Sequence, residues 1–178
     1  MVKFKLYIIL TSLALISCHQ EDTKIVKQVN ESNHNKPDQT IIKINVSFVD
    51  SNYTKAVLYA DSGFTYNSTN RTILKNNIKV DFYAKESFKR ISTLSADSVV
   101  IDDNTKNMTA YGNVVVKSDS TFTTLETKLL QWDNKSRKLF TPEFVKITSP
   151  NEILQGYGFE SDEKLSYYKI FKVTGQQR

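Results

Sequence analysis

One pattern that recurs four times constrains the fold of this chain more than any other feature of its sequence. Each copy opens with a leucine and continues with mostly small or polar residues: Leu58-Tyr-Ala-Asp-Ser, Leu94-Ser-Ala-Asp-Ser, Leu125-Glu-Thr-Lys-Leu and Leu154-Gln-Gly-Tyr-Gly. A polar turn and a second apolar segment follow each copy, so the repeating unit is a strand pair of about 30 residues. One such pair cannot bury its apolar face alone. Stacking four pairs predicts an all-β fold, an elongated open β-jellyroll or two-sheet sandwich with edge strands at both ends.

The second strand of each unit indicates which side chains face inward. Three of these strands place a lysine, Lys79, Lys146 or Lys172, between two apolar neighbours. Because successive side chains of a strand point to opposite faces, the apolar neighbours share one face and the lysines stay in water. Burying three unpaired lysines would be too costly. With matching positions of the first strands, the predicted inner face consists of Ile78, Val80, Leu94, Ala96, Val114, Val116, Leu125, Val145, Ile147, Phe171 and Val173.

The first strand of each unit changes its apolar parity partway along. Leu94 and Ala96 share one parity, whereas Val99 and Ile101 share the other. A β-bulge re-aims a strand in this way, because it inserts one extra residue. We therefore predict bulges at the three places where this change occurs, near Asp97-Ser98, Lys128-Leu129 and Tyr157-Gly158. The alternative is that both faces are half-apolar and that no bulge exists.

The first residues have the pattern of a bacterial export signal. Lys3 and Lys5 precede an apolar stretch that is short for a permanent membrane span. The stretch ends in Leu-Ile-Ser-Cys18, which resembles the lipobox of bacterial lipoproteins. The resemblance implies that residues 1–17 are a cleaved signal peptide and that Cys18, the sole cysteine, is acylated and anchors the chain to a membrane. The alternatives are an ordinary signal peptide with a chance cysteine and an uncleaved anchor.

A change in composition separates a tether from a domain. Residues 18–40 are mostly polar and are predicted to form a flexible tether after the lipidated cysteine. A short helix through Ile25, Val26 and Val29 that docks on a partner is the alternative. From Ile41 onward, alternation and β-branched residues are typical of strands, so residues 41–178 are predicted to be the folded domain.

The predicted domain lacks the residues that most enzyme chemistries need. Both histidines, His19 and His34, lie in the tether, which excludes Ser-His-Asp and Cys-His catalysis and zinc sites with His or Cys ligands from the domain. There is no glycine-rich phosphate loop. The net charge is +5, and the basic residues are scattered along the sequence. We therefore expect no catalytic residue, cofactor or metal, and no binding to nucleic acid.

Carboxylates are the one catalytic possibility left in the domain. Asp97, Asp102, Asp103 and Asp133 recur at polar turns, where an aspartate stabilises the backbone through its own side chain. A carbohydrate enzyme that uses two of them is an alternative. A binding protein is the preferred interpretation.

The repeats resemble the LptC/LptA (OstA-like) family of lipopolysaccharide transport proteins over residues 45–175. The resemblance rests on Leu94-x-Ala-Asp, Tyr111-Gly-Asn-Val-x-Val, Leu125-x-Thr-x-x-Leu-x-Trp and Leu154-x-Gly-x-Gly-Phe-Glu-Ser. It implies a twisted β-jellyroll whose inner face, the residues given above, binds the acyl chains of lipopolysaccharide. The alternative is a closed core without lipid, as in a structural or adhesive β-repeat lipoprotein.

The resemblance also implies partners and a location. An anchored single domain is similar to LptC, which accepts lipopolysaccharide from the inner-membrane ABC transporter of LptB, LptF and LptG and passes it to LptA. The first strands, near residues 42–49, would face the transporter. The C-terminal strand would be the edge offered to an LptA-like jellyroll, through Tyr167, Tyr168, Ile170 and Val173. Many relatives use a transmembrane helix, whereas the lipobox here implies a lipid anchor in the periplasm, with the inner membrane favoured.

Overall fold

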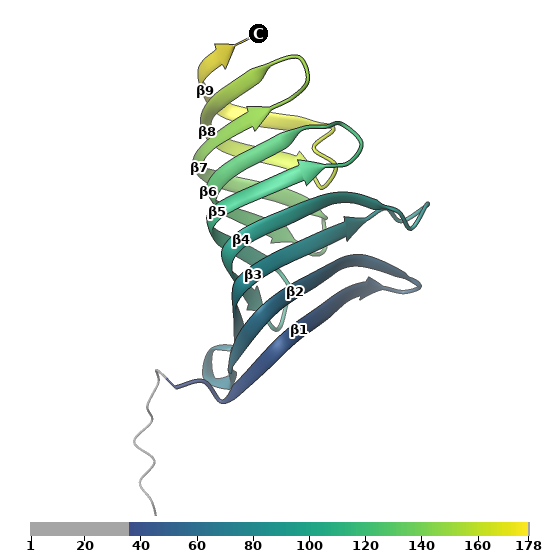
Figure 1. Cartoon of the computed structure of the whole chain (residues 1–178), viewed down its shortest axis with the longest axis vertical. Helices are drawn as coiled ribbons and strands as arrows, with labels where there is room; N and C mark the ends of the chain where they lie inside the picture. Colours follow the sequence, from purple (N-terminus) through teal and green to yellow (C-terminus); the bar gives the residue numbers. More distant parts are fainter. Residues whose placement is uncertain (1–35, 178) are drawn as a thin grey trace, which may run out of the picture. The chain divides into compact units, whose positions relative to one another are not determined.

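The computed structural model describes residues 36–177, which form one antiparallel β-sheet (Figure 1). Its strands are β1 (Gln39–Asp50), β2 (Tyr53–Tyr66), β3 (Arg71–Tyr83), β4 (Arg90–Asp102), β5 (Met108–Ser118), β6 (Thr124–Asp133), β7 (Lys138–Thr148), β8 (Ile153–Asp162) and β9 (Tyr168–Gln177). In this part of the chain the one helical element is the 3-10 turn η1 (Asn67–Thr69). The order of the strands in the sheet is their order in the chain, so β1 and β9 are its edges.

The structure begins close to the predicted domain boundary. Strand β1 starts at Gln39, whereas the domain was predicted to start at Ile41. The predicted signal peptide, Cys18 and most of the tether lie outside the described residues. Between residues 36 and 177 no helix is long and apolar enough to cross a membrane.

The sheet folds over about halfway along its strands (Figure 1). Shifts of register interrupt the strand pairing there, for example between Ser95 and Ser98 of β4 and between Tyr111 and Val114 of β5. At this line, which we call the corner, the strands turn and return behind the front layer. The all-β open jellyroll is confirmed, and its two layers are halves of one sheet rather than two separate sheets.

The corner accounts for the change of parity in the sequence. On β4 the buried side chains change parity between Leu94 and Val99, and β6 and β8 change in the same way. The register breaks near Asp97-Ser98, Lys128-Leu129 and Tyr157-Gly158 are therefore confirmed. The extra residue, however, lies on the facing strand, since two residues of β4 oppose three of β5 around Gly112 and Asn113. These two residues have positive φ, which glycine and asparagine adopt more easily than other residues.

The interior between the two layers is apolar. Its largest fully buried side chains include Trp132, Phe82 and Phe159, and one cluster of buried apolar residues extends from Ile44 of β1 to Leu165 after β8. The predicted inner-face residues on β3 to β7 all point into this cluster. They are Ile78, Val80, Leu94, Val114, Val116, Leu125, Val145 and Ile147, which are buried, and Ala96, which is half-buried.

The prediction was wrong for the last strand. Phe171 and Val173 are 59% and 56% exposed, so neither belongs to the buried inner face. Pairing with β8 sets the phase of β9: Ile170 lies opposite the buried Phe159, and this turns the next residue, Phe171, to the outer face. Val173 lies opposite Gly156 on an edge strand that has a neighbour on one side only, and it stays exposed there.

Candidate functional site

The interior opens to solvent at the β1 end. A cavity of about 440 Å³ lies there, which we call the mouth. Its apolar wall comes from inward-facing residues of β1, β3 and β4, namely Ile44, Val46, Phe48, Leu74 and Ile101. The more exposed part of its lining, which we call the rim, contains polar side chains beside the exposed Ile41 and Val49, namely Thr65, Thr72, Asp103, Lys106 and Asn134. An apolar ligand with a polar end fits this distribution, because the wall favours hydrocarbon and the rim favours water.

Behind the mouth the interior is filled by aromatic side chains. Trp132 of β6 packs edge-on against Phe48 with 5.4 Å between ring centroids, and lies 5.7 Å from the ring of Phe82. The void beside these rings is only about 10 Å³, at most enough for one water molecule. The interior therefore consists of an open mouth and a packed section that begins at Trp132.

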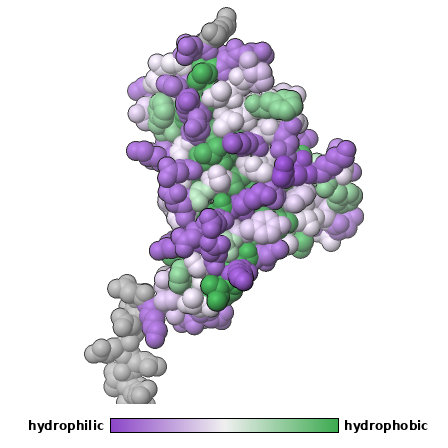
Figure 2. Space-filling model, in the orientation of Figure 1, coloured by the Kyte–Doolittle hydropathy of each residue, from purple (hydrophilic) through white to green (hydrophobic). Residues whose placement is uncertain are grey.

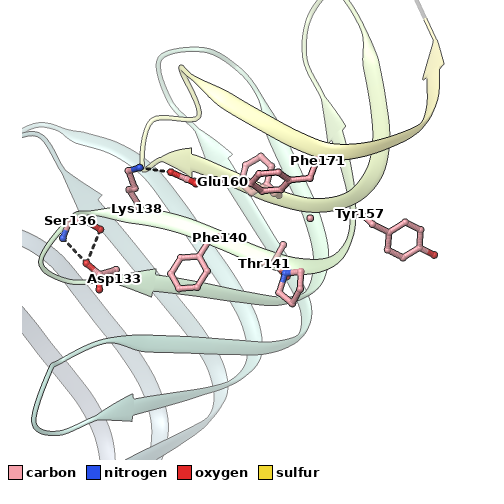
Figure 3. Close-up of a pocket in the computed structure, with 11 residues that line it drawn as sticks. Asp133, Ser136, Lys138, Phe140, Thr141, Tyr157, Glu160 and Phe171 are labelled. Carbon is pink, nitrogen blue, oxygen red and sulfur yellow. Dashed lines mark hydrogen bonds and ion pairs between the residues drawn. The ribbon is translucent and has the colours of Figure 1, made fainter.

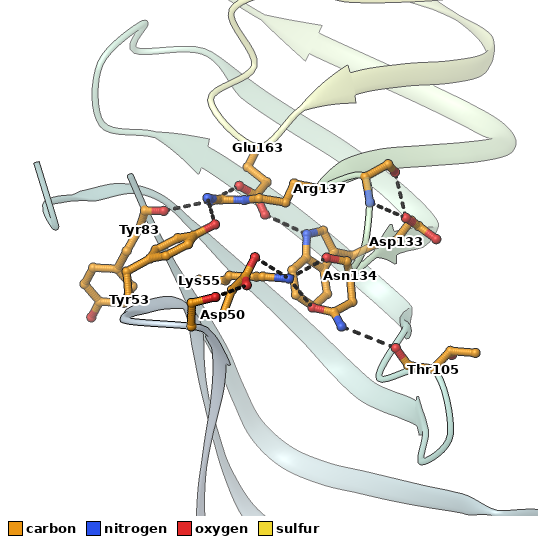
Figure 4. A network of polar contacts seen from close by, with 12 residues as sticks. Asp50, Tyr53, Lys55, Tyr83, Thr105, Asp133, Asn134, Arg137 and Glu163 are labelled. Atoms are coloured by element: carbon orange, nitrogen blue, oxygen red, sulfur yellow. Dashed lines mark hydrogen bonds and ion pairs between the residues drawn. The ribbon is translucent and has the colours of Figure 1, made fainter. Parts of the chain in front are cut away.

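Two rows of turns meet on the side opposite the corner. The first row, called the first lip, contains residues 67–70, 103–107, 134–137 and 163–167. The second lip contains residues 51–52, 84–89, 119–123 and 149–152 together with the strand ends beside them. Polar contacts join the two lips over the packed section, and we call this set of contacts the seam (Figure 4).

Lys55 and Arg137 make most of the seam. The Lys55 ammonium donates to the Asn134 carbonyl at 2.9 Å and to its side-chain oxygen at 3.2 Å. The Arg137 guanidinium donates to the Tyr83 carbonyl at 2.7 Å and to the Tyr53 hydroxyl at 3.1 Å, and it forms an ion pair with Glu163 (Figure 4). Residues far apart in the chain are thereby joined across the interior.

Glu163 is the buried carboxylate of the seam. Its carboxylate accepts a hydrogen bond from the Trp132 indole at 2.7 Å, and its backbone carbonyl accepts one from the Ser92 hydroxyl at 2.5 Å. Burial raises the pKa of this carboxyl, although Arg137 and Trp132 act in the opposite direction. Arg137 Nε is buried and has no hydrogen-bond partner among the described residues. The seam is thus a desolvated and incompletely satisfied polar cluster.

A second hollow, of about 700 Å³, lies on the outside of the sheet over β7 to β9 (Figure 3). The rings of Phe140, Tyr157 and Phe171 line it, and Lys138 forms an ion pair with Glu160 at one end. The face seen in Figure 2 is a mixture of hydrophilic side chains and scattered apolar ones. The outer hollow and the mouth have no lining residue in common.

Two of the four aspartates predicted to stabilise turns, Asp102 and Asp133, act on the backbone as expected. Asp102 accepts hydrogen bonds from the backbone of Asn104 and Thr105, and Asp133 accepts one from the backbone of Ser136. These hydrogen bonds hold the pKa of both carboxyls below their usual value.

The prediction was wrong for the other two aspartates. Asp97 lies within β4 and accepts a hydrogen bond from the Asn113 side chain, and Asp103 accepts one from the Thr72 hydroxyl. No group of three or more His, Cys, Asp or Glu side chains that could hold a metal ion occurs in residues 36–177.

The C-terminal strand is an edge of the sheet, as the proposed partner contact requires. Of the predicted contact residues, Tyr168 and Ile170 pack inward against the core, whereas Val173 and Tyr167 are exposed. The role of this edge in binding a partner stays a prediction. The same holds for the binding of lipid by the inner-face residues.

Sequence reasoning missed the seam. Arg137 and Glu163 belong to polar turns, which are normally solvated, and nothing in the local pattern distinguishes them from their neighbours. Trp132 was a usable signal. It is the only tryptophan of the chain and follows Leu130 on the inward parity of β6.

Two comparisons with known proteins match most of the chain. The family model described as "LptC: Lipopolysaccharide-assembly, LptC-related" matches residues 6–176. Among solved structures, the chain is similar to "LptH, the LptA homologous periplasmic component of the conserved lipopolysaccharide transport device from Pseudomonas aeruginosa". The two share 14% sequence identity with a TM-score of 0.51, over 67% of this chain and 84% of that one, which supports the architecture. No curated protein matches the chain in sequence.

Proposed function

The chain belongs to the LptC-related family of lipopolysaccharide-assembly proteins, and we propose that it is a membrane-anchored periplasmic carrier of lipopolysaccharide. It accepts the lipid from an inner-membrane ABC transporter and passes it to an LptA-like jellyroll. A role in lipopolysaccharide transport follows from the family. The direction of transfer, the partners and the anchor belong to the proposal.

The mouth at β1 is the observation that carries the proposal. Acyl chains need an apolar wall, and Ile44, Val46, Phe48, Leu74 and Ile101 provide one that opens directly to solvent. The polar rim suits the phosphorylated sugars of lipopolysaccharide, which stay hydrated. Hydrocarbon removed from water contributes about 0.8 kcal/mol for each CH₂ group, so even a partly inserted chain gains affinity without a covalent bond.

Two unpaired sheet edges support transfer between proteins. Among residues 36–177, strand β1 pairs only with β2, and β9 pairs only with β8. A strand from another jellyroll can extend the sheet at either edge through backbone hydrogen bonds. We assign the β1 edge to the LptF and LptG subunits of the transporter, and the β9 edge, with Tyr167, Tyr168, Ile170 and Val173, to the LptA-like partner.

The anchor in this proposal is the lipid on Cys18. Three acyl chains bind a membrane far more tightly than the single chain that gives only reversible attachment. Since the tether leads directly into β1, the open mouth is on the first strand after the anchor. This order suits a domain that takes its ligand from the membrane that holds it.

Photo-crosslinking in cells tests the proposal. A benzophenone amino acid at Val46, which lines the mouth, should give adducts with lipopolysaccharide. The matched control is Asn45, the next residue of β1, which is exposed and does not line the cavity. Adducts at both positions, or at neither in a folded and lipidated protein, would contradict the proposal.

The packed section favours one competing function. Because Trp132, Phe48 and Phe82 fill the interior behind the mouth, a structural or adhesive β-repeat lipoprotein with a closed core is the second candidate. Such a protein would show no lipid adduct at Val46. It would also keep its function when the mouth is filled by Val46→Trp.

A further inference from the structure

The interior can widen on one side only. At the corner, strands β2 to β8 run continuously from one layer into the other, so the layers are covalently joined there. On the opposite side no strand of the described residues joins the layers, and the two lips meet through the noncovalent seam. The volume of the cavity at the mouth is about 440 Å³, whereas the void in the packed section is about 10 Å³. A ligand that extends past the mouth therefore requires the seam to part.

Arg137 is the residue on which the closure of the lips depends most. It extends from the turn between β6 and β7 and contacts Tyr53 and Tyr83 on the second lip (Figure 4). Its guanidinium also lies over the Tyr53 ring, 5.6 Å from the ring centroid. On its own lip it forms the ion pair with Glu163. One side chain thus ties two neighbouring turns of the first lip to two strands of the second.

Glu163 connects this closure to the side chain that blocks the interior. Its carboxylate accepts a hydrogen bond from the Trp132 indole N–H, and its backbone carbonyl accepts one from the hydroxyl of Ser92 on the second lip. The Trp132 ring lies between Phe48 of the mouth and Phe82 of the packed section. Phe48 and Phe82 lie near strand ends of the second lip, so separation of the lips takes both rings away from Trp132 and frees its ring to move.

The chemistry of the seam suits a contact that opens. Removing two charges from water is unfavourable. Their attraction offsets this cost only when the remaining polar atoms of both groups are also hydrogen-bonded. Here Arg137 Nε has no partner in the described chain. Apolar residues of similar size would close the interior at least as firmly. A polar closure of this kind can exchange its contacts for water when the lips part.

We propose that Arg137 and Glu163 form a latch that holds Trp132 across the interior, and that an acyl chain passes from the mouth toward β9 only when this latch opens. The inference rests on the proposed function for the identity of the ligand. The latch itself is a property of the protein alone and can be measured without lipid.

The single tryptophan makes the latch observable. In the full chain held in phospholipid nanodiscs, acrylamide should quench Trp132 fluorescence weakly in the wild type. Quenching should increase in Arg137→Met, which loses both hydrogen bonds to the second lip together with the ion pair. The matched control is Glu160→Gln, which removes the Lys138–Glu160 pair on the outer face of the neighbouring strands and should leave quenching unchanged.

Dibromostearate reports the passage of an acyl chain, because bromine quenches an indole that it touches. Its rate of quenching should rise about tenfold in Arg137→Met, which corresponds to a closure weakened by about 1.4 kcal/mol. The same rate in wild type and variant would overturn the latch while leaving a lipid-binding interior intact. Increased acrylamide quenching with no dibromostearate quenching in any variant would support the latch and contradict the carrier function.

A covalent closure tests the inference without weakening the fold. Thr121 of the second lip donates to the Lys164 carbonyl of the first lip at 3.4 Å, and neither side chain belongs to the Arg137 cluster. Thr121→Cys with Lys164→Cys, joined by a short reducible thiol cross-linker, should slow dibromostearate quenching, and reduction should restore it. Each single cysteine variant is the control. Unchanged quenching in the cross-linked protein would overturn the proposal.

Discussion

The side-chain amide of Asn113 donates a hydrogen bond to the Asp97 carboxylate, with 2.9 Å between Nδ2 and Oδ2. The same relationship joins Asn77 to Asp61 at 2.6 Å, one repeat earlier in the chain. Both pairs lie at the corner and connect a strand that changes parity to the strand that carries the extra residues. The aspartate of the repeated Leu-x-Ala-Asp pattern therefore serves the fold of the sheet at its corner.

Gly112 next to this pair is expected to be intolerant of a side chain. Its φ is +72°, and a Cβ there would overlap the Asp97 carboxylate. Gly112→Ala should lower the free energy of unfolding by more than about 1 kcal/mol, as measured by urea denaturation. Gly175→Ala is the control, because its Cβ would meet Gln155 at 3.6 Å, an ordinary contact. Equal effects of the two substitutions would contradict the explanation of the corner.

Leu125 tests the packing of the interior. It is fully buried on β6, so Leu125→Ala removes apolar contacts and leaves a cavity. The expected loss is about 2–5 kcal/mol in the free energy of unfolding. Ile42→Ala on β1, where the side chain is 77% exposed, should change it by less than about 0.5 kcal/mol. A loss below about 1 kcal/mol for Leu125→Ala would indicate an interior that is already open.

The facing of β9 can be tested by two adjacent substitutions. Ile170 packs against the core, whereas Phe171 lies on the outer face. Ile170→Ala should therefore destabilise the protein by about 1 kcal/mol more than Phe171→Ala in thermal or chemical denaturation. The reverse order would support the facing predicted from the sequence.

Glu163 should make stability fall as pH rises. Burial raises the pKa of its carboxyl, so the native state binds this proton more tightly than the unfolded chain. Its contribution is complete below the unfolded value of about 4.3 and is lost as pH rises through the higher native value. Arg137, Trp132 and Asp162 are the other groups that act on it. Glu163→Gln should remove this slope in urea denaturation at a series of pH values; an unchanged slope would contradict the assignment.

Asp133 should contribute in the opposite direction. Hydrogen bonds from Ser136 lower the pKa of its carboxyl, so its contribution is present above the unfolded value of about 3.9. The contribution is lost as pH falls through the lower native value. The difference in stability between wild type and Asp133→Asn should thus shrink below about pH 4. A difference that stays constant down to acid unfolding would show that the charge of Asp133 is not involved.

Period-two alternation was sufficient to predict most of the interior. Val114, Val116, Val145 and Ile147 lie where strand alternation predicts them, since the pleat and the burial of one face leave little freedom. The sequence did not indicate which strand carries the extra residue at the corner. An extra residue on β4 and one on β5 are both compatible with the change of parity seen in the sequence of β4. Positive φ at Asn113 identifies β5, and that property is conformational.

The seam could not be predicted for a different reason. Arg137 meets Tyr53 and Tyr83 from far away in the sequence, and Glu163 meets Ser92 in the same way. No periodicity relates residues at such separations. Their burial depends on how far the sheet twists before its lips meet, which is a property of the assembled sheet. Strand alternation thus predicts which face is apolar, but not how that face is closed.

The pairing of each strand with its sequence neighbours has a consequence for how the molecule acquires its structure. Hairpins can form and join one after another as the chain emerges with its N-terminus first, because no strand waits for a distant partner. The contacts between Arg137 and Tyr53, and between Glu163 and Ser92, close large loops and should form last. Growth of the sheet and closure of its lips are then separate kinetic events, and a newly made molecule passes through an open-sided form before it reaches the closed one.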